Sequence, residues 1–141
     1  MKVSELMTKN VIGISPEESA EVTARTLTHY NIGMLPVCSN GKLCGVVTDR
    51  DLVIRCMALG KQPAQTKVKE LMTGKTLSVS PDMDAETAAR LMGSKQLRRL
   101  PVVGEGKLCG IISLGDIARR EENQYLTAQA LNSITSNVQK G

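Results

Sequence analysis

Two short segments carry a hydroxyl and a carboxylate at the same spacing. Thr48-x-x-Asp51 and Ser113-x-x-Asp116 each begin at the end of an apolar run. A carboxylate can accept two hydrogen bonds, which suits the neighbouring 2′- and 3′-hydroxyls of a ribose, and charge-assisted bonds are the stronger kind. A hydroxyl at the start of a helix lies beside unpaired N–H groups, which favour an anionic phosphate. These residue types could therefore bind a nucleotide.

The same segments also fit a capping box, in which hydroxyl and carboxylate only start a helix. Helix starts far outnumber nucleotide sites, so capping is favoured for either segment taken alone. The duplication favours a ligand role for Asp51, and both roles coexist if the hydroxyl caps while the carboxylate faces the ligand. Asp116 is the weaker candidate, because Ser113-Leu114-Gly115 is less polar than Thr48-Asp49-Arg50.

Both segments belong to an internal repeat. Shifted by 65 residues, the chain aligns with itself without a gap. The matched segments include residues 3–8 with 68–73, 41–45 with 106–110, and Asp51 with Asp116. Two copies of one unit predict a pseudo-two-fold arrangement in which each copy buries an apolar face against the other.

Each copy is predicted to fold in the order β-α-β-β-α, an α/β (α+β) arrangement. Short strands are expected at residues 11–14 and 76–79, and Ser15-Pro16 has the N-cap and first-turn residues of a helix start, as does Ser80-Pro81. The helices that follow place apolar residues on one face, namely Ala20, Ala24 and Leu27 in the first copy and Ala85, Ala89 and Met92 in the second.

The rest of each copy is predicted to be a hairpin followed by a second helix. Asn-Gly and Gly-x-Gly turn signals join residues 35–38 to 42–48 and residues 100–103 to 107–113. The second helices begin near Asp49 and Leu114. The expected domains are repeat 1 at 1–60, a linker at 61–67, repeat 2 at 68–122 and a helical tail at 123–141. In the tail, Leu126, Ala130, Ile134 and Val138 recur every four residues, which predicts a helix that packs on a neighbouring element or a partner chain.

The composition excludes several function classes. Only two of the 141 residues are aromatic, which excludes a face that stacks successive nucleic-acid bases. A net charge of +4 without a basic block also argues against nucleic acid as a partner. One histidine and four scattered cysteines give no metal-ligand spacing, so no metal site is predicted. No apolar stretch is long enough to span a membrane. We therefore expect a reduced, cytoplasmic protein with buried thiols.

Arg98-Arg99 is the densest basic spot, and Gly33-Met34 stands at the equivalent place in the first copy. This asymmetry predicts two unequal sites. The arginine pair could clamp a phosphate with bidentate geometry, or it could be a solvated or salt-bridged strand start. Arg50 is a second phosphate candidate, or simply a partner of Asp49 or Asp51.

The element order, the Leu-Pro-Val before each hairpin and the Gly-x-x-Thr/Ser-x-x-Asp after it together resemble the CBS domain, named after cystathionine β-synthase. CBS domains occur as tandem pairs called Bateman modules, and the resemblance covers residues 1 to about 122. It implies two clefts between the repeats that bind AMP, ADP, ATP or S-adenosylmethionine. By position, Thr48 and Asp51 would hold a ribose in one cleft and Ser113 and Asp116 in the other. The residues expected to border the adenine or phosphates are Gly33, Met34, Leu35, Pro36, Arg98, Arg99, Leu100 and Pro101.

The resemblance further implies a regulatory binding module that requires no cofactor and is not an enzyme, since no nucleophile–base pair or phosphate loop is found. It also implies a homodimer and, downstream, a protein target. The alternative is a structural CBS dimer with empty clefts, whose surface or terminal helix contacts another protein.

Overall fold

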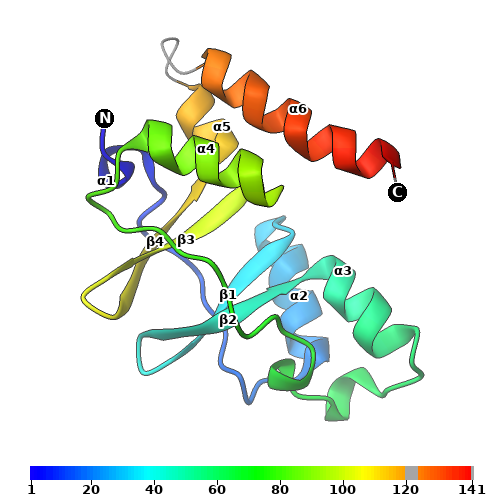
Figure 1. The fold of residues 1–141 in the computed structure, drawn as a ribbon. Coiled ribbons are helices and arrows are strands. Elements are labelled where there is room, and N and C mark those ends of the chain that lie inside the picture. Colours follow the sequence, from blue (N-terminus) through cyan, green and yellow to red (C-terminus); the bar gives the residue numbers. More distant parts are fainter. Residues whose placement is uncertain (120–123, 141) are drawn as a thin grey trace. The chain divides into compact units, whose positions relative to one another are not determined.

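Two antiparallel hairpins organise the molecule, and each belongs to its own folded unit (Figure 1). The computed structural model describes residues 1–119 and 124–140, with side chains except at residues 124 and 137–140. Unit 1 comprises Met1–Val11 with Leu77–Gly141, and unit 2 comprises Ile12–Thr76. Each unit is described by itself below.

Unit 2 carries the first hairpin. Helix α2 (Ala20–Tyr30) precedes strands β1 (Met34–Ser39) and β2 (Lys42–Thr48), and α3 (Asp49–Asp51) continues into a π-helical stretch, η1 (Leu52–Met57). Two short 3₁₀ turns follow, η2 (Pro63–Gln65) and η3 (Val68–Glu70).

Unit 1 repeats this order and adds one helix. Its elements are α1 (Val3–Leu6), α4 (Ala85–Lys95), β3 (Arg99–Gly104), β4 (Lys107–Ser113), α5 (Leu114–Ala118) and α6 (Gln124–Lys140). The mixed α and β class, the duplicated hairpins and the terminal helix are therefore confirmed. Among the described residues, no helix has the length and apolar character needed to cross a membrane.

The hairpin turns follow the predicted chemistry. Asn40 and Gly41 have φ values of 53° and 79°, and Glu105 and Gly106 have 52° and 77°. Left-handed conformations at both central residues define a two-residue type I′ turn, which matches the twist of the flanking strands. In each hairpin, one register shift interrupts the pairing, at Val37/Cys38 in the first and at Val102/Val103 in the second.

Two expectations about element bounds are wrong. The strands predicted at 11–14 and 76–79 reduce to single parallel bridges, Ile14 with Val37 and Val79 with Val102. The first helix begins at Ala20 with Ser19 as its cap, because Ser19 Oγ accepts from Val22 N–H at 3.1 Å. Ser15 Oγ instead accepts from Glu17 N–H at 3.2 Å and forms a turn ahead of the helix.

The same shift occurs in the second copy, where α4 begins at Ala85. Ser80 Oγ accepts from Asp82 N–H at 3.2 Å and so forms the turn that precedes the helix.

The units do not coincide with the sequence repeats, because the first segment of each copy packs with the other copy. In unit 1, Val3 N–H donates to Met83 O, and Thr8 pairs with Ile111. In unit 2, Val68 N–H donates to Glu18 O, and Thr73 pairs with Val46. Residues 3–8 of the first copy thus pack on the second copy, and residues 68–73 of the second copy pack at the equivalent position on the first. These two segments are called the exchanged segments below.

Helix α6 lies along α4 and contacts α5 within unit 1 (Figure 1). Ala130 and Ile134 are 4% and 5% exposed and belong to the core of this unit, with Leu126 partly buried against it. A Cβ on Gly93 would lie 2.9 Å from Ala130 Cα, so α4 and α6 approach too closely for any larger residue there. The predicted amphipathic tail helix is confirmed and packs within its own chain, while the Val138 side chain lies outside the described residues.

Candidate functional site

Thr48 and Asp51 form a reciprocal hydrogen-bonded box where β2 ends and α3 begins. Thr48 N–H donates to Asp51 Oδ2 at 2.9 Å, and Asp51 N–H donates to Thr48 Oγ1 at 3.1 Å. Asp51 is only 8% exposed. The capping interpretation is confirmed here, and one carboxylate oxygen is committed to the backbone.

Ser113 and Asp116 reproduce this box in unit 1. Ser113 N–H donates to Asp116 Oδ2 at 2.9 Å, and Asp116 N–H donates to Ser113 Oγ at 3.1 Å. Asp116 is 7% exposed. The two boxes are thus equivalent in geometry, although Thr stands in one and Ser in the other.

The second carboxylate oxygen of each box faces an arginine. Arg55 Nε lies 3.7 Å from Asp51 Oδ1, and Arg119 Nη1 lies 3.6 Å from Asp116 Oδ1. These separations are ion pairs without good hydrogen bonds. Each Oδ1 therefore keeps its capacity to accept a hydrogen bond from a ligand hydroxyl.

Arg55 is a positioning residue that sequence reasoning missed. Its Nη1 donates to the carbonyls of Leu71 and Met72 at 3.1 Å and 3.2 Å, which ties η1 to the exchanged segment. The alternative role of Arg50, as a side-chain partner of Asp49 or Asp51, is not seen among the described residues. There, Arg55 pairs with Asp51, and the Arg50 backbone N–H donates to Asp49 Oδ1. The four-residue spacing from Asp51 to Arg55 was the available signal.

The residues before and at the two prolines lie mainly inside the units. Leu35 and Leu100 are 0% and 1% exposed. The carbonyls of Pro36 and Pro101 accept from Ile14 and Val79 N–H, both at 3.0 Å. These residues could border a ligand only through backbone atoms, whereas Gly33 and Met34 are half-buried at the start of β1.

Arg98, Arg99 and Ser113 come together at one cavity in unit 1. Strand pairing places Arg99 opposite Ser113, and Leu114 N–H donates to Arg98 O at 2.9 Å. The cavity has a volume of about 350 Å³ and is lined by Arg98, Arg99, Ser113, Leu114, Gly115, Thr127 and Leu131. Both arginines are exposed, and neither forms an ion pair with another described residue. Asp116 does not line this cavity.

The equivalent place in unit 2 has the opposite charge. Asp49 N–H donates to Gly33 O at 3.0 Å, as Leu114 does to Arg98. A Cβ on Gly33 would lie 3.5 Å from Asp49 Oδ2, so the carboxylate stands over the glycine. The predicted inequality of the two copies is therefore an arginine pair in one and a carboxylate in the other.

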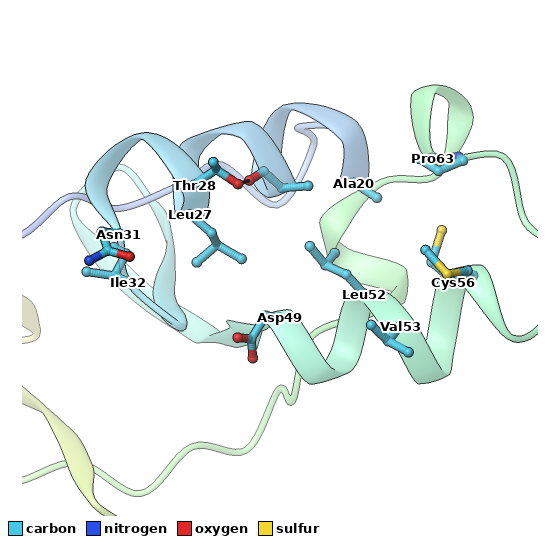
Figure 2. Close-up of a pocket in the computed structure, with 12 residues that line it drawn as sticks. Ala20, Leu27, Thr28, Asn31, Ile32, Asp49, Leu52, Val53, Cys56 and Pro63 are labelled. Atoms are coloured by element: carbon cyan, nitrogen blue, oxygen red, sulfur yellow. Dashed lines mark hydrogen bonds between the residues drawn. The ribbon is translucent and has the colours of Figure 1, made fainter.

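Unit 2 also has an apolar groove between α2 and the α3–η1 helix. Figure 2 shows Leu27 and Leu52 pointing into the space between these helices, with Asp49 near one end. The groove has a volume of about 470 Å³, and its rim includes Val53 and Met57, which are 50% and 70% exposed. Thr48 and Asp51 do not line it.

The cysteines are free thiols, and the expectation that all of them are buried is wrong. Cys56 is buried, whereas Cys38, Cys44 and Cys109 are half-buried. Burial raises the pKa of the Cys38 thiol, with a further contribution from Cys44. In the described part of the chain, no three His, Cys, Asp or Glu residues converge as a metal site would require.

A family model for the CBS domain matches residues 3–57 and 68–123. The chain belongs to the CBS-domain family. Each match contains one hairpin and one hydroxyl–carboxylate box, so the CBS copies follow the sequence repeats rather than the folded units.

Three CBS relatives place this chain among proteins of similar length. The CBS domain-containing protein YhcV of Bacillus subtilis (strain 168) is 37% identical over 133 residues, which cover 94% of each chain. The crystal structure of Hypoxic Response Protein I with two coordinated zinc ions has a TM-score of 0.79 and 30% identity, covering 85% of this chain and 98% of that one. The crystal structure of CBSX2 in complex with AMP has a TM-score of 0.76 and 32% identity, covering 88% and 98%.

Proposed function

We propose that this CBS pair is a cytoplasmic regulatory module that binds an adenosine nucleotide without turning it over. The observation that carries the proposal is the convergence of Arg98, Arg99 and Ser113 on one cavity of about 350 Å³. Ligand pockets occupy roughly 300–1,000 Å³, so the cavity is large enough for part of a nucleotide. The AMP complex of CBSX2 supports the choice of ligand class.

The two guanidinium groups indicate which part of the ligand this cavity receives. Arg98 and Arg99 are adjacent like charges without an acidic partner among the described residues. An anion between them would relieve their repulsion, and guanidinium groups bind phosphate oxygens in bidentate geometry. We therefore assign the phosphate groups of AMP, ADP or ATP to the Arg98–Arg99 cavity.

The Asp49 carboxylate gives the equivalent place in unit 2 a different preference. It disfavours a phosphate, because the two negative charges repel each other. A ligand without negative charge, or one with a positive sulfonium group such as S-adenosylmethionine, suits it better. The ligand class would then differ between the two copies.

A thermal-shift panel tests the nucleotide proposal. AMP, ADP, ATP, S-adenosylmethionine and uncharged adenosine are each added to the full chain. A ligand at one hundred times its Kd adds about 2.7 kcal/mol of stability, which raises the Tm of a chain of this size by roughly 6–12 °C. Phosphorylated adenosines should shift the Tm more than adenosine. No shift with any compound at millimolar concentration would contradict the proposal.

A pair of charge variants isolates the arginines. The Arg98→Gln/Arg99→Gln double variant should lose the advantage of AMP over adenosine. The matched control is Lys42→Gln/Lys107→Gln, which removes the same charge from two exposed strand starts outside the cavity. If both double variants lose AMP binding equally, only net charge matters and the assignment to the cavity is wrong.

The unit 2 groove favours a second function, self-association. Its counterpart in unit 1 is covered by α6, so a groove of this type accepts an apolar helix face. We propose a second copy of this chain as the occupant, which makes the protein a homodimer through unit 2. Val53→Glu should reduce the mass measured by light scattering to that of a monomer, whereas the exposed Tyr125→Glu should not. A wild-type chain with the mass of a monomer would reject the dimer. An unchanged dimer mass with Val53→Glu would show that the dimer does not form through this groove.

A further inference from the structure

The Arg98–Arg99 cavity has a wall that does not belong to either CBS copy. Five of its lining residues lie between Arg98 and Gly115, and the other two, Thr127 and Leu131, lie on α6. Residues four apart share one face of a helix. This face adjoins the buried stripe of Ala130 and Ile134 that holds α6 in the core of unit 1. The cavity is therefore complete only while α6 is docked.

We infer that α6 is part of the ligand site, with Thr127 and Leu131 in contact with the nucleotide held by Arg98 and Arg99. This inference rests on the proposed function and names further binding residues for it. Thr127 lines the cavity together with both arginines, so a ligand held by Arg98 and Arg99 would contact its side chain. Leu131 faces the same cavity as Leu114, and together they supply the apolar surface that a ribose or purine requires.

Contacts that involve no ligand also hold α6 in place. Ala130 packs on Gly93, whereas the first copy has Thr28 at the position equivalent to Gly93. The Thr28 side chain lies along the unit 2 groove, which no helix of its own unit covers (Figure 2). The wall formed by α6 thus distinguishes the unit 1 cavity from the equivalent place in unit 2, in addition to the difference in charge between the two.

A coupling follows from this arrangement. A nucleotide that contacts α6 binds the docked form better than the undocked form, so it must stabilise docking by the same factor by which docking improves its binding. The state of the C-terminal helix then reports whether unit 1 is occupied.

The test places one carboxylate on each of two faces of α6 in the full chain. Thr127→Glu puts a negative charge beside Arg98 and Arg99, where it competes with phosphate. Asn132→Glu adds the same charge to the exposed side of the same helix, about 140° around its axis. AMP affinity, measured by calorimetry, should fall at least tenfold in Thr127→Glu, since a paired guanidinium loses its electrostatic attraction for phosphate. It should change less than twofold in Asn132→Glu.

Two further results separate failure of this inference from failure of the proposed function. If wild type and Arg98→Gln/Arg99→Gln bind AMP equally weakly, the nucleotide site itself is wrong. If the arginine variant loses binding while Thr127→Glu matches Asn132→Glu, the site stands and the role of α6 is overturned. Hydrogen exchange of α6 in wild type gives a readout without any variant. Saturating AMP should slow exchange across residues 126–136, and unchanged exchange there would also overturn the inference.

Discussion

Thr48 and Asp51 hold each other in place before any ligand is considered. The Asp51 carboxylate and the Thr48 hydroxyl each accept from the other's backbone N–H. This leaves Asp51 Oδ1 as the atom that could meet a ribose, with Arg55 at 3.7 Å. The cap therefore orients the carboxylate, and a single residue can serve stability and binding together.

The cap predicts a measurable contribution to stability. Thr48→Ala should lower the free energy of unfolding by about 1 kcal/mol, because N–H groups at the helix start lose their acceptor. Thr48→Ser is the matched control, since Ser113 performs the same task in the other copy at the same 3.1 Å. Urea denaturation measures both variants. Equal losses in the two would show that the methyl group of Thr48, not its hydroxyl, is what matters.

Removing the charge of Asp49 is expected to strengthen nucleotide binding rather than weaken it. Asp49→Asn should strengthen AMP binding at unit 2 by roughly fivefold, since removing a unit charge near a phosphate relieves about 1 kcal/mol in a solvated site. Calorimetry would show this as a second or tighter binding event. Asp82→Asn removes an exposed carboxylate from unit 1, and an equal effect there would attribute the gain to net charge alone.

The sequence could predict candidate residues only where the residues that act together lie close together in the chain. Spacing alone indicated the two hydroxyl–carboxylate boxes, and the difference between Arg98-Arg99 and Gly33-Met34 indicated unequal sites. Thr127 and Leu131 carried no such signal, because they lie outside the repeat. The role proposed for them depends on the packing of α6 at Gly93, a contact between residues distant in sequence.

At the scale of elements, turn chemistry was the most dependable guide. Asn40-Gly41 favours positive φ at both positions, so its hairpin followed directly. The helix start was misplaced because Ser15 and Ser19 both qualify as caps by type. Ser19 prevails since the residues just before the exchanged segment pair there. Lys67 forms a β-bridge with Ser19, and Ala20 N–H donates to Thr66 O.

The close approach of Gly45 to Thr73 predicts that the packing of residues 68–73 on β2 leaves no room for a side chain at position 45. A Cβ there would lie less than 3 Å from the Thr73 carbonyl oxygen, which is backbone and cannot rotate away. Gly45→Ala should therefore destabilise the protein by roughly 1–3 kcal/mol or more, the cost of overpacking. Gly74→Ala is the control, because no atom lies within 4 Å of its added Cβ. Similar Tm values for the two variants would contradict this fit.

The turn before α2 predicts an acid-dependent loss of stability. Glu17 accepts from Lys67 Nζ at 2.7 Å and Lys69 Nζ at 3.0 Å, and these bonds hold its pKa below the usual value of 4.5. A lowered folded-state pKa means that its contribution is present above about pH 4.5 and is lost as the pH falls through the folded value. Because the pair is exposed, the effect should be small and weaken in salt.

Stability curves from pH 3 to 7 for wild type and Glu17→Gln provide the measurement. The two curves should converge at the acidic end and separate toward pH 7. A constant offset across this range would show that Glu17 acts through packing instead of charge.

At the scale of the whole molecule, repeats and folded units divide the chain differently. Residues 3–8 and 68–73 have nearly the same sequence, with Val3 and Val68 both 0% exposed. Composition does not distinguish the two segments, so the sequence could not predict which segment fills which position. The duplication was therefore plain from sequence, whereas the exchange required three-dimensional structure.

The exchange predicts which fragment folds. Residues 12–76 include every segment of unit 2, whereas residues 1–60 lack Val68 and Leu71, both 0% exposed in its core. The 12–76 fragment should unfold cooperatively in urea, and the 1–60 fragment should not. The expected stability is low, because domains of about 60 residues bury only around 60% of their surface. Cooperative unfolding of 1–60 would contradict this prediction and show that residues 3–8 can replace residues 68–73 in unit 2.

The exchanged segments also suggest how a chain with two copies could arise. A protein with one copy that packs in the same way would take the first segment of a second molecule, which gives a domain-swapped dimer whose stability depends on concentration. Joining two copies through residues 61–67 makes the exchange of first segments intramolecular. A short linker of this kind gives each segment an effective concentration near the millimolar range. Gene duplication would then have freed the fold from its dependence on protein abundance. Sequence drift could follow independently in each half, leaving arginines in one and a carboxylate in the other.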